Sequence, residues 1–235
     1  MADSQATIVE AEVQNPELRH HFADMEQQKN AASLGMWLFL VTEIMFFGGM
    51  FCAYLVYRTS HFAALAAGSQ TLDIKWGAIN TAVLIVSSVT VVLAINAIQH
   101  GKPRTTINYL VITVLLGLVF LGIKSIEYTN KFEEHHVPGA GFHFTGTFDD
   151  NGKQIPVAEN EVQLFFSLYF AMTGMHALHM IIGIGIMTTL AVMTWKGRFS
   201  AQYYTPIENA GLYWHLVDII WIYLFPLLYL ISRHT

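Results

Sequence analysis

Five stretches of this 235-residue chain are long and apolar enough to cross a lipid bilayer. A helix needs about 20 apolar residues to span the hydrocarbon core, and the predicted spans are residues 33–57, 74–99, 106–129, 162–194 and 212–231. Because lipid offers no hydrogen bonds to the backbone, each span must satisfy its own peptide groups and is expected to be a helix. The sequence therefore predicts an all-α polytopic membrane protein, a bundle of five transmembrane helices.

The composition excludes most soluble functions. Hydrophobic residues make up 54% of the chain and charged residues only 12%, which is far from the balance of a soluble domain. The formal net charge is −5, and no run of Lys and Arg is long enough to hold a nucleic-acid backbone, so nucleic acid is not expected as a partner. The single cysteine, Cys52, cannot form an internal disulfide and is expected to be a small buried side chain.

The segments outside the spans are polar. Residues 1–32 carry several acidic side chains and no apolar core, which predicts a polar N-terminal tail rather than a signal peptide, followed by a membrane domain over 33–235. The loop 130–161 contains several Gly residues and a Pro-Gly pair, which indicates a chain of turns. Within it, the sequence Asp-Asn-Gly at 150–152 favours a hairpin.

The loop charges predict the orientation of the chain in the membrane. The short loop 101–105 is basic, whereas the long loop 130–161 is acidic. Basic loops stay in the cytoplasm. We therefore expect a cytoplasmic N-terminus, an extracytoplasmic loop 130–161 and a C-terminus outside.

Glu43 is the most unusual group inside the predicted spans. It lies in the first span, where no Lys or Arg can pair with it, and a charged side chain in hydrocarbon is rare and needs a partner. One interpretation is a protonated carboxyl group that donates a hydrogen bond to a neighbouring helix. The others are a proton relay or gate and, less favoured, an ion-binding group.

Lys124 and Glu127 lie near the end of the third span with i, i+3 spacing. Opposite charges at that spacing face each other on one side of a helix. The spacing predicts an ion pair at the membrane boundary, with a structural role favoured over a catalytic one.

The same spacing recurs in the fourth span at His176 and His179, and in the fifth at His215 and Asp218. Two imidazoles at i, i+3 can face one metal ion, but two are a weak signal, and hydrogen bonds between helices are the favoured interpretation. A carboxylate can accept a hydrogen bond from an imidazole at this spacing. We therefore interpret His215 and Asp218 as a buried polar contact that holds neighbouring helices together. We predict no metal site in this chain.

Trp195 ends the fourth span and is followed by Lys196 and Arg198. An interfacial aromatic residue beside two cations is a candidate contact for phospholipid headgroups. The two cations are equally well interpreted as the ordinary positively charged flank of a cytoplasmic loop.

Several motifs follow one another along the spans: Gly35-Met36-Trp37-Leu38-Phe39 with Glu43 and Phe46-Phe47-Gly48, then Asn80-Thr81-Ala82-Val83-Leu84, Glu127-Tyr128, Thr173-Gly174-Met175-His176-Ala177-Leu178-His179, and Tyr213-Trp214-His215-Leu216-Val217-Asp218-Ile219-Ile220-Trp221. In this order, over residues 33–231, they resemble the successive helices of subunit III of heme-copper cytochrome c oxidases. Larger members of that family have seven helices, and this sequence is similar to the shorter form that lacks the first two. The loop 130–161 is longer than expected for the family.

The resemblance implies a role in aerobic respiration, in a complex that reduces O2 to water with proton pumping. This chain would be a non-catalytic subunit without a redox centre, and heme and copper would lie in partner subunits. It would stabilise subunit I beside subunit II, hold phospholipid between its helices and support proton uptake, with Glu43 as the family's buried carboxylate. The expected location is the plasma membrane of a prokaryote.

Other functions are kept as alternatives. Quinol oxidases and accessory subunits of nitric oxide reductases share this subunit's fold, although Thr42-Glu43 with Phe46-Phe47 favours the cytochrome c branch. A proton-coupled transporter could use Glu43 and the pair in the fifth span, but the chain shows no internal repeat. A membrane metalloenzyme is the last alternative.

Overall fold

The structure, a computed structural model, describes residues 18–139, 141–144, 147–148, 154–155 and 157–231. Its elements in chain order are α2 (Met25–Ser60), α3 (Phe62–Gln70), α4 (Ile74–Gln99), α5 (Pro103–Glu133), β1 (Thr147–Phe148), β2 (Gln154–Ile155), α6 (Glu159–Trp195) and α7 (Thr205–Tyr229). Five of the described helices, all but α3, are long and apolar enough to cross a membrane. The predicted all-α bundle of five membrane helices is confirmed, and the two-residue strands are a small addition to it.

The number of membrane helices agrees with the prediction, but the residues at which most of them begin and end do not. Helix α4 has the predicted bounds, whereas α5 and α6 extend past the predicted spans at both ends, and α7 begins earlier, at Thr205. Helix α2 begins at Met25 because the Asp24 carboxylate caps it, accepting a hydrogen bond of 2.7 Å from the backbone N–H of Gln27. The last residues of the predicted polar tail are therefore helical.

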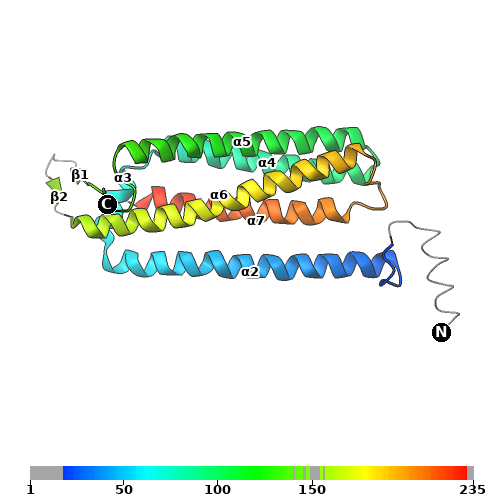
Figure 1. The fold of residues 1–235 in the computed structure, drawn as a ribbon, viewed down its shortest axis with the longest axis horizontal. Helices are drawn as coiled ribbons and strands as arrows, with labels where there is room; N and C mark the ends of the chain where they lie inside the picture. Colours follow the sequence, from blue (N-terminus) through cyan, green and yellow to red (C-terminus); the bar gives the residue numbers. More distant parts are fainter. Residues whose placement is uncertain (1–17, 140, 145–146, 149–153, 156, 232–235) are drawn as a thin grey trace.

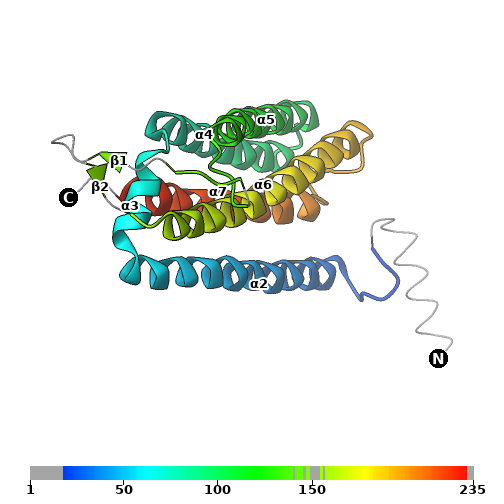
Figure 2. The ribbon, with the colours of Figure 1, turned by 60° about the vertical axis from the view of Figure 1, so that its left-hand side comes forward.

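Helices α4, α5, α6 and α7 pack as one group, and α2 runs alongside α6 and α7 (Figure 1, Figure 2). Half of the most apolar segment of α7 is buried inside the bundle, compared with 17% of that of α2. Helix α3 and the segment between α5 and α6 lie at one end, called here the α3 end, and the start of α2 lies at the opposite end, called the N-side end (Figure 1). Helix α7 is thus central and α2 peripheral.

Two glycines allow α7 to lie close to α4. A Cβ atom added at Gly77 of α4 would come within 2.6 Å of the Phe225 ring, and one added at Gly211 of α7 would come within 2.7 Å of Ile95. Real Cβ contacts are longer than this, so a larger residue at Gly77 would displace the Phe225 ring, and one at Gly211 would displace the end of the Ile95 side chain. Small residues that permit such approach are typical of helix packing in membranes.

Helix α3 and the exposure of Cys52 were not foreseen. Helix α3 has nine residues, too few to span a bilayer, and it packs against α6 at the α3 end with Ala64 and Leu65 buried.

Cys52 is exposed, so the expectation of a buried side chain is wrong. Helix α2 buries one narrow stripe that includes Phe47 and Tyr54, and Cys52 lies on another side of the helix.

The segment between α5 and α6 contains the pairing that a hairpin needs. Strands β1 and β2 are antiparallel, with Thr147 opposite Ile155 and Phe148 opposite Gln154. The predicted turn at 150–152 lies between them but outside the described residues.

Replacing Gly77 by leucine is expected to destabilise the bundle by about 1–3 kcal/mol, the usual cost of overpacking a well-filled interior. The new side chain would overlap the Phe225 ring. Gly122 of α5 is the matched control, because nothing lies within 4 Å of the position of its Cβ atom, and Gly122→Leu should change stability little. Thermal unfolding in detergent, followed by gel filtration, measures both. Equal losses would contradict the close packing of α4 on α7.

Candidate functional site

Glu43 and His179 form a hydrogen-bonded pair between α2 and α6. The Oε2 atom of Glu43 lies 2.9 Å from Nε2 of His179, and the exposed fractions of the two side chains are 17% and 13%. The other ring nitrogen of His179, Nδ1, lies 2.8 Å from the backbone carbonyl oxygen of Met175. The ring also contacts the edge of Phe47, with centroids 5.2 Å apart. Both ends of the imidazole are therefore fixed.

These contacts fix the number of protons in the pair. A carbonyl oxygen can only accept, so the hydrogen bond to Met175 assigns a proton to Nδ1 of His179. The 2.9 Å contact at Nε2 then has two forms: a protonated Glu43 donates to Nε2, or a protonated Nε2 donates to the Glu43 carboxylate. In both forms one proton lies between the two atoms and the pair has no net charge. Removing it would leave two acceptors face to face.

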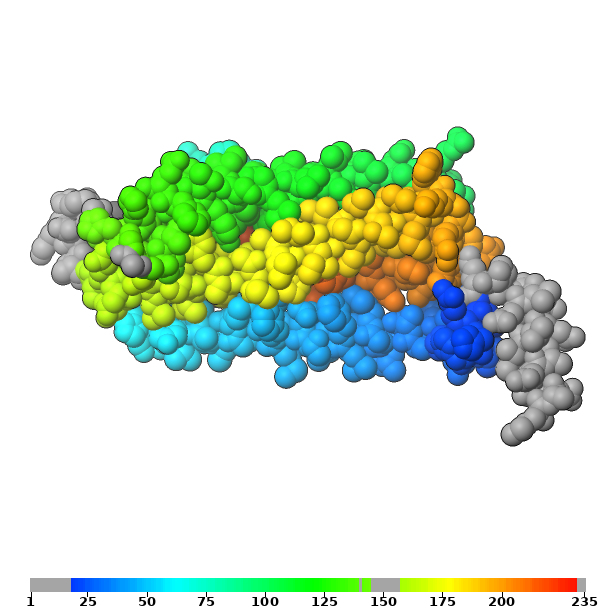
Figure 3. All heavy atoms as spheres, in the orientation of Figure 1, coloured from blue at the N-terminus to red at the C-terminus, as the bar shows by residue number. Residues whose placement is uncertain are grey.

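The pair lies in the wall of a groove between α2 and the neighbouring α6 and α7. The groove has a volume of about 580 Å³, and most of its remaining lining is apolar, including Met36, Phe39, Ile182, Ile186 and Leu190. Figure 3 shows this gap between α2 and α6, with atoms of α7 visible at its base. The proton held by Glu43 and His179 is therefore next to an apolar groove that opens to the membrane.

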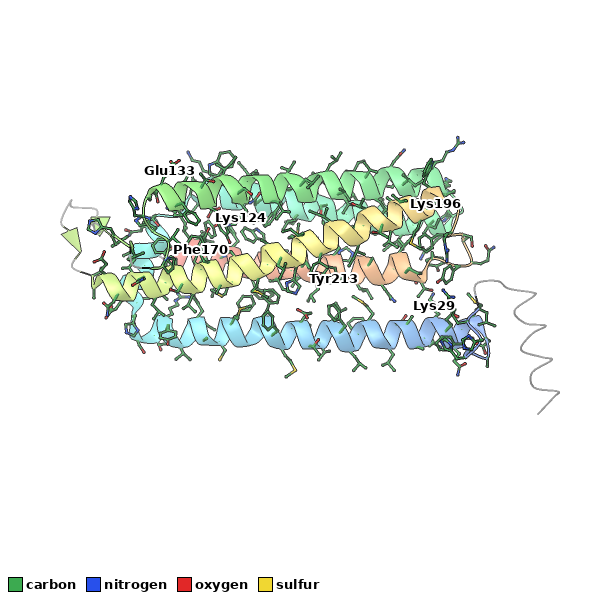
Figure 4. All side chains as sticks on the ribbon, viewed as in Figure 1. Lys29, Lys124, Glu133, Phe170, Lys196 and Tyr213 are labelled. Carbon is green, nitrogen blue, oxygen red and sulfur yellow. The ribbon has the colours of Figure 1, made fainter. Side chains whose placement is uncertain are left out.

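The groove becomes polar toward the N-side end. A recess there shares Pro206 and Asn209 with the groove and is also lined by Lys29, which Figure 4 labels at this end. The ammonium group of Lys29 lies 3.5 Å from the Glu208 carboxylate and 5.3 Å from the centre of the Tyr204 ring. An apolar groove with a charged mouth has the polarity of a phospholipid.

Lys124 and Glu127 form a second polar centre, where Lys124 points from α5 toward α6 and α7 (Figure 4). The ammonium group donates hydrogen bonds to Glu127 at 3.0 Å, to the Tyr169 hydroxyl at 3.1 Å and to the Tyr229 hydroxyl at 2.9 Å. Both hydroxyls donate in turn to Oε1 of Glu127, at 2.6 and 2.5 Å. Each of the three ammonium protons has an acceptor, and the carboxylate accepts three hydrogen bonds.

This closed network connects α5, α6 and α7 near the α3 end. The predicted contact between Lys124 and Glu127 is present, but the two tyrosines that complete it were not predicted, because they are 42 and 102 residues from Glu127 in the sequence. A buried ion pair is tolerated when its remaining hydrogen-bonding capacity is filled in this way. The geometry favours a structural role over a catalytic one.

His176 does not join His179. Its ring packs 5.4 Å from Phe120 and 5.3 Å from Trp221, centre to centre, and neither of its nitrogens has a hydrogen-bond partner among the described residues. The predicted hydrogen bond to another helix is therefore formed by His179, and the prediction is wrong for His176. No three His, Cys, Asp or Glu side chains of the described chain gather as a metal site would require.

The predicted hydrogen bond between His215 and Asp218 is not formed. Nδ1 of His215 lies instead 2.6 Å from the Ser88 hydroxyl on α4. Asp218 is buried near the Ser88 hydroxyl, but neither carboxylate oxygen has a partner with hydrogen-bond geometry among the described residues. Residues at i, i+3 point about 60° apart around a helix, so His215 faces the seam between α7 and α4 while Asp218 faces the interior.

Trp195, Lys196 and Arg198 lie exposed at the N-side end, where α6 ends (Figure 4). A shallow apolar groove of about 270 Å³ between α5 and α6 has Trp195 in its lining. The two cations that follow Trp195 in the chain are therefore close to the end of a membrane-facing apolar groove.

Comparison with known proteins finds one family. The family model described as cytochrome c oxidase subunit III matches residues 19–150 and 158–233. Cytochrome c oxidase subunit 3 of Thermostichus vulcanus is 33% identical over 204 residues, which cover 85% of this chain and 87% of the relative. Cytochrome bo(3) ubiquinol oxidase subunit 3 of Pseudomonas aeruginosa is 30% identical over 198 residues, 84% of each chain. Cytochrome c oxidase subunit 3 of Oncorhynchus mykiss is 31% identical over 201 residues, 83% of this chain and 67% of the relative.

Lys124→Met is expected to destabilise the protein by about 3–5 kcal/mol, because it leaves the Glu127 carboxylate buried without its cation. The double variant Lys124→Met with Glu127→Leu should recover most of that loss, because both charges are gone. Unfolding by a denaturing detergent measures the two variants. A double variant that is as unstable as the sum of the two single variants would show that the ion pair contributes no coupling.

Proposed function

Because this chain belongs to the cytochrome c oxidase subunit III family of heme-copper oxidases, we propose that it is a non-redox subunit that supports proton uptake by the catalytic subunit. Subunit III of an oxidase works inside a membrane complex. The complex reduces O2 to water and pumps protons, and heme and copper lie in the partner subunits I and II. The chain itself binds neither heme nor copper.

The Glu43–His179 pair is the observation that carries this proposal. The pair holds one proton inside the membrane domain, because Nδ1 of His179 is committed to the carbonyl of Met175. Its net charge is zero with that proton in either position, so it does not carry the full cost of an unpaired buried charge. Such a pair would support proton uptake in one of two ways. It would hold a proton inside the membrane domain, or it would hold α2 against α6 beside the route by which protons reach the catalytic subunit.

The polarity of both membrane-facing grooves suits phospholipid. The groove beside Glu43 has an apolar interior and a mouth that contains Lys29. The groove between α5 and α6 ends at Trp195, which precedes Lys196 and Arg198. In each, acyl chains would lie along the apolar wall and an anionic headgroup would meet a cation.

The environment of the chain follows from the same proposal. The chain is a multi-pass protein of a prokaryotic plasma membrane, with the N-side end in the cytoplasm. Lys29 and Lys196 lie at that end (Figure 4), and Arg198 follows two residues after Lys196, which suits the positive-inside rule.

A quinol oxidase is the second candidate, favoured by the relative from Pseudomonas aeruginosa that is named as subunit 3 of a ubiquinol oxidase. The electron donor is chosen by other subunits, so it does not change the role proposed for this chain. Activity of the purified complex with reduced cytochrome c and with ubiquinol distinguishes the two candidates.

The proposal is tested by purifying the complex under mild conditions. We expect the chain to travel with heme-bearing subunits. Purification alone, as a colourless protein, would overturn the proposal.

Within the complex, Glu43→Gln is expected to leave the optical spectrum of the hemes unchanged and to slow proton uptake or shorten the lifetime of activity several-fold. His179→Gln should have the same effect, because the amide group introduced in either variant can form a hydrogen bond but cannot exchange a proton with its partner. Thr42→Ala is the control, since the exposed Thr42 hydroxyl has as its one partner among the described residues the Phe39 carbonyl of its own helix, at 2.6 Å. Loss of heme, or unchanged uptake and lifetime in both variants, would contradict the role of the pair.

Replacing Lys196 and Arg198 together by glutamine is expected to lower the amount of anionic phospholipid that purifies with the complex, with little change in neutral lipid. Lys75→Gln is the control, because Lys75 is an exposed cation at the α3 end. Mass spectrometry of extracted lipid measures both. Equal anionic lipid in the two preparations would show that the cations after Trp195 do not hold headgroups.

A further inference from the structure

The seam between α4 and α7 has a polar centre near the middle of the membrane domain. Ser88 lies near the middle of α4 and His215 near the middle of α7, with 2.6 Å between the hydroxyl oxygen and Nδ1. Both side chains are partly exposed on the outer side of the bundle. The pair therefore lies at a depth where a surrounding bilayer is hydrocarbon.

One polar atom of His215 is unpaired at this depth. If the Ser88 hydroxyl donates to Nδ1, then Nε2 carries a proton and has nothing to donate to. If Nδ1 donates to Ser88, then Nε2 is an unpaired acceptor. No described residue hydrogen-bonds Nε2, and this nitrogen is not among the buried unpaired atoms, so it faces outward in either tautomer.

The neighbouring surface of α7 also carries polar groups that face outward. Tyr223 is 63% exposed, and its hydroxyl has no hydrogen bond to a described residue. Pro226 has no N–H to give to the carbonyl of Ile222, four residues earlier on the same exposed face. Three groups able to form hydrogen bonds thus lie along one outer face of α7.

Exposed hydroxyls on other faces behave differently. Ser125 of α5 donates to the Leu121 carbonyl at 2.8 Å, and Thr188 of α6 donates to the Ile184 carbonyl at 2.7 Å. Such hydroxyls are satisfied by their own helix and suit contact with lipid. The unpaired side-chain groups of His215 and Tyr223 do not suit it, because acyl chains offer no partner and unsatisfied polar groups are costly there.

We propose that the outer face of α7, with the adjoining edge of α4, receives a transmembrane helix of another oxidase subunit that places a hydrogen-bonding side chain opposite His215. The inference rests on the proposed function, which supplies the partner. Headgroups of lipid cannot reach this depth, whereas a polar side chain on a neighbouring helix can. The large exposed ring of Tyr223 is typical of residues that anchor protein interfaces.

Photo-crosslinking in native membranes tests the surface. A benzophenone amino acid is placed at Ile219, between His215 and Tyr223, and as a control at Leu118 on α5, which is equally exposed at 50% against 49%. We expect Ile219 to give a covalent product with a heme-bearing subunit, in several-fold higher yield than Leu118. Lipid adducts alone at Ile219, or a higher protein yield from Leu118, would overturn the inference. The proposed function fails separately, if the unmodified chain does not purify with heme.

Substitution of His215 tests the polar contact. His215→Leu should loosen the chain from the complex during a detergent titration, by roughly three- to tenfold in dissociation, as expected for one hydrogen bond between membrane helices. His215→Gln keeps a polar group near the position of Nε2 and should restore retention, and Ser125→Ala should not change it. Equal retention of His215→Leu and the unmodified chain would overturn the contact.

Discussion

Polar side chains inside a bilayer must find their partners within protein, and the network around Lys124 is where this requirement shapes the bundle most strongly. A lone ammonium group at this depth would be too costly to keep. Here it is surrounded by a carboxylate and two hydroxyls from α6 and α7, with every contact between 2.5 and 3.1 Å. The network joins α5 to both α6 and α7. It therefore helps to hold α7 at the centre of the bundle, where its other faces contact α4 and α2.

The sequence predicts the membrane helices well because hydropathy depends on local composition alone. It predicts the Lys124–Glu127 contact for a similar reason, since an i, i+3 pair on one helix needs no knowledge of the fold. It cannot predict that Glu43 meets His179, 136 residues away, because that contact depends on how α2 is placed beside α6. The ends of α2 and the short α3 were missed, because capping by Asp24 and packing on α6 are not visible in hydropathy.

The i, i+3 rule failed where neighbouring helices offer different environments on the two sides of a helix. His176 and His179 are separated by about 60° around α6, which is enough to turn one toward the aromatic rings of Phe120 and Trp221 and the other toward α2. The same separation turns His215 to Ser88 and Asp218 into the interior. Spacing within a helix predicts which side chains can meet, and the tertiary contacts decide whether they do.

The proton held by Glu43 also has a structural consequence. Helix α2 is the least buried of the five membrane helices. Its side-chain hydrogen bonds to α7 are near its two ends, from Asn209 to the carbonyl of Ala32 and from Tyr54 to the carbonyl of Leu227. Toward the middle, the Glu43–His179 hydrogen bond connects it to α6. Losing the shared proton would replace that attraction by two opposed acceptors and favour a wider groove. The shared proton therefore favours the position of α2 close to α6.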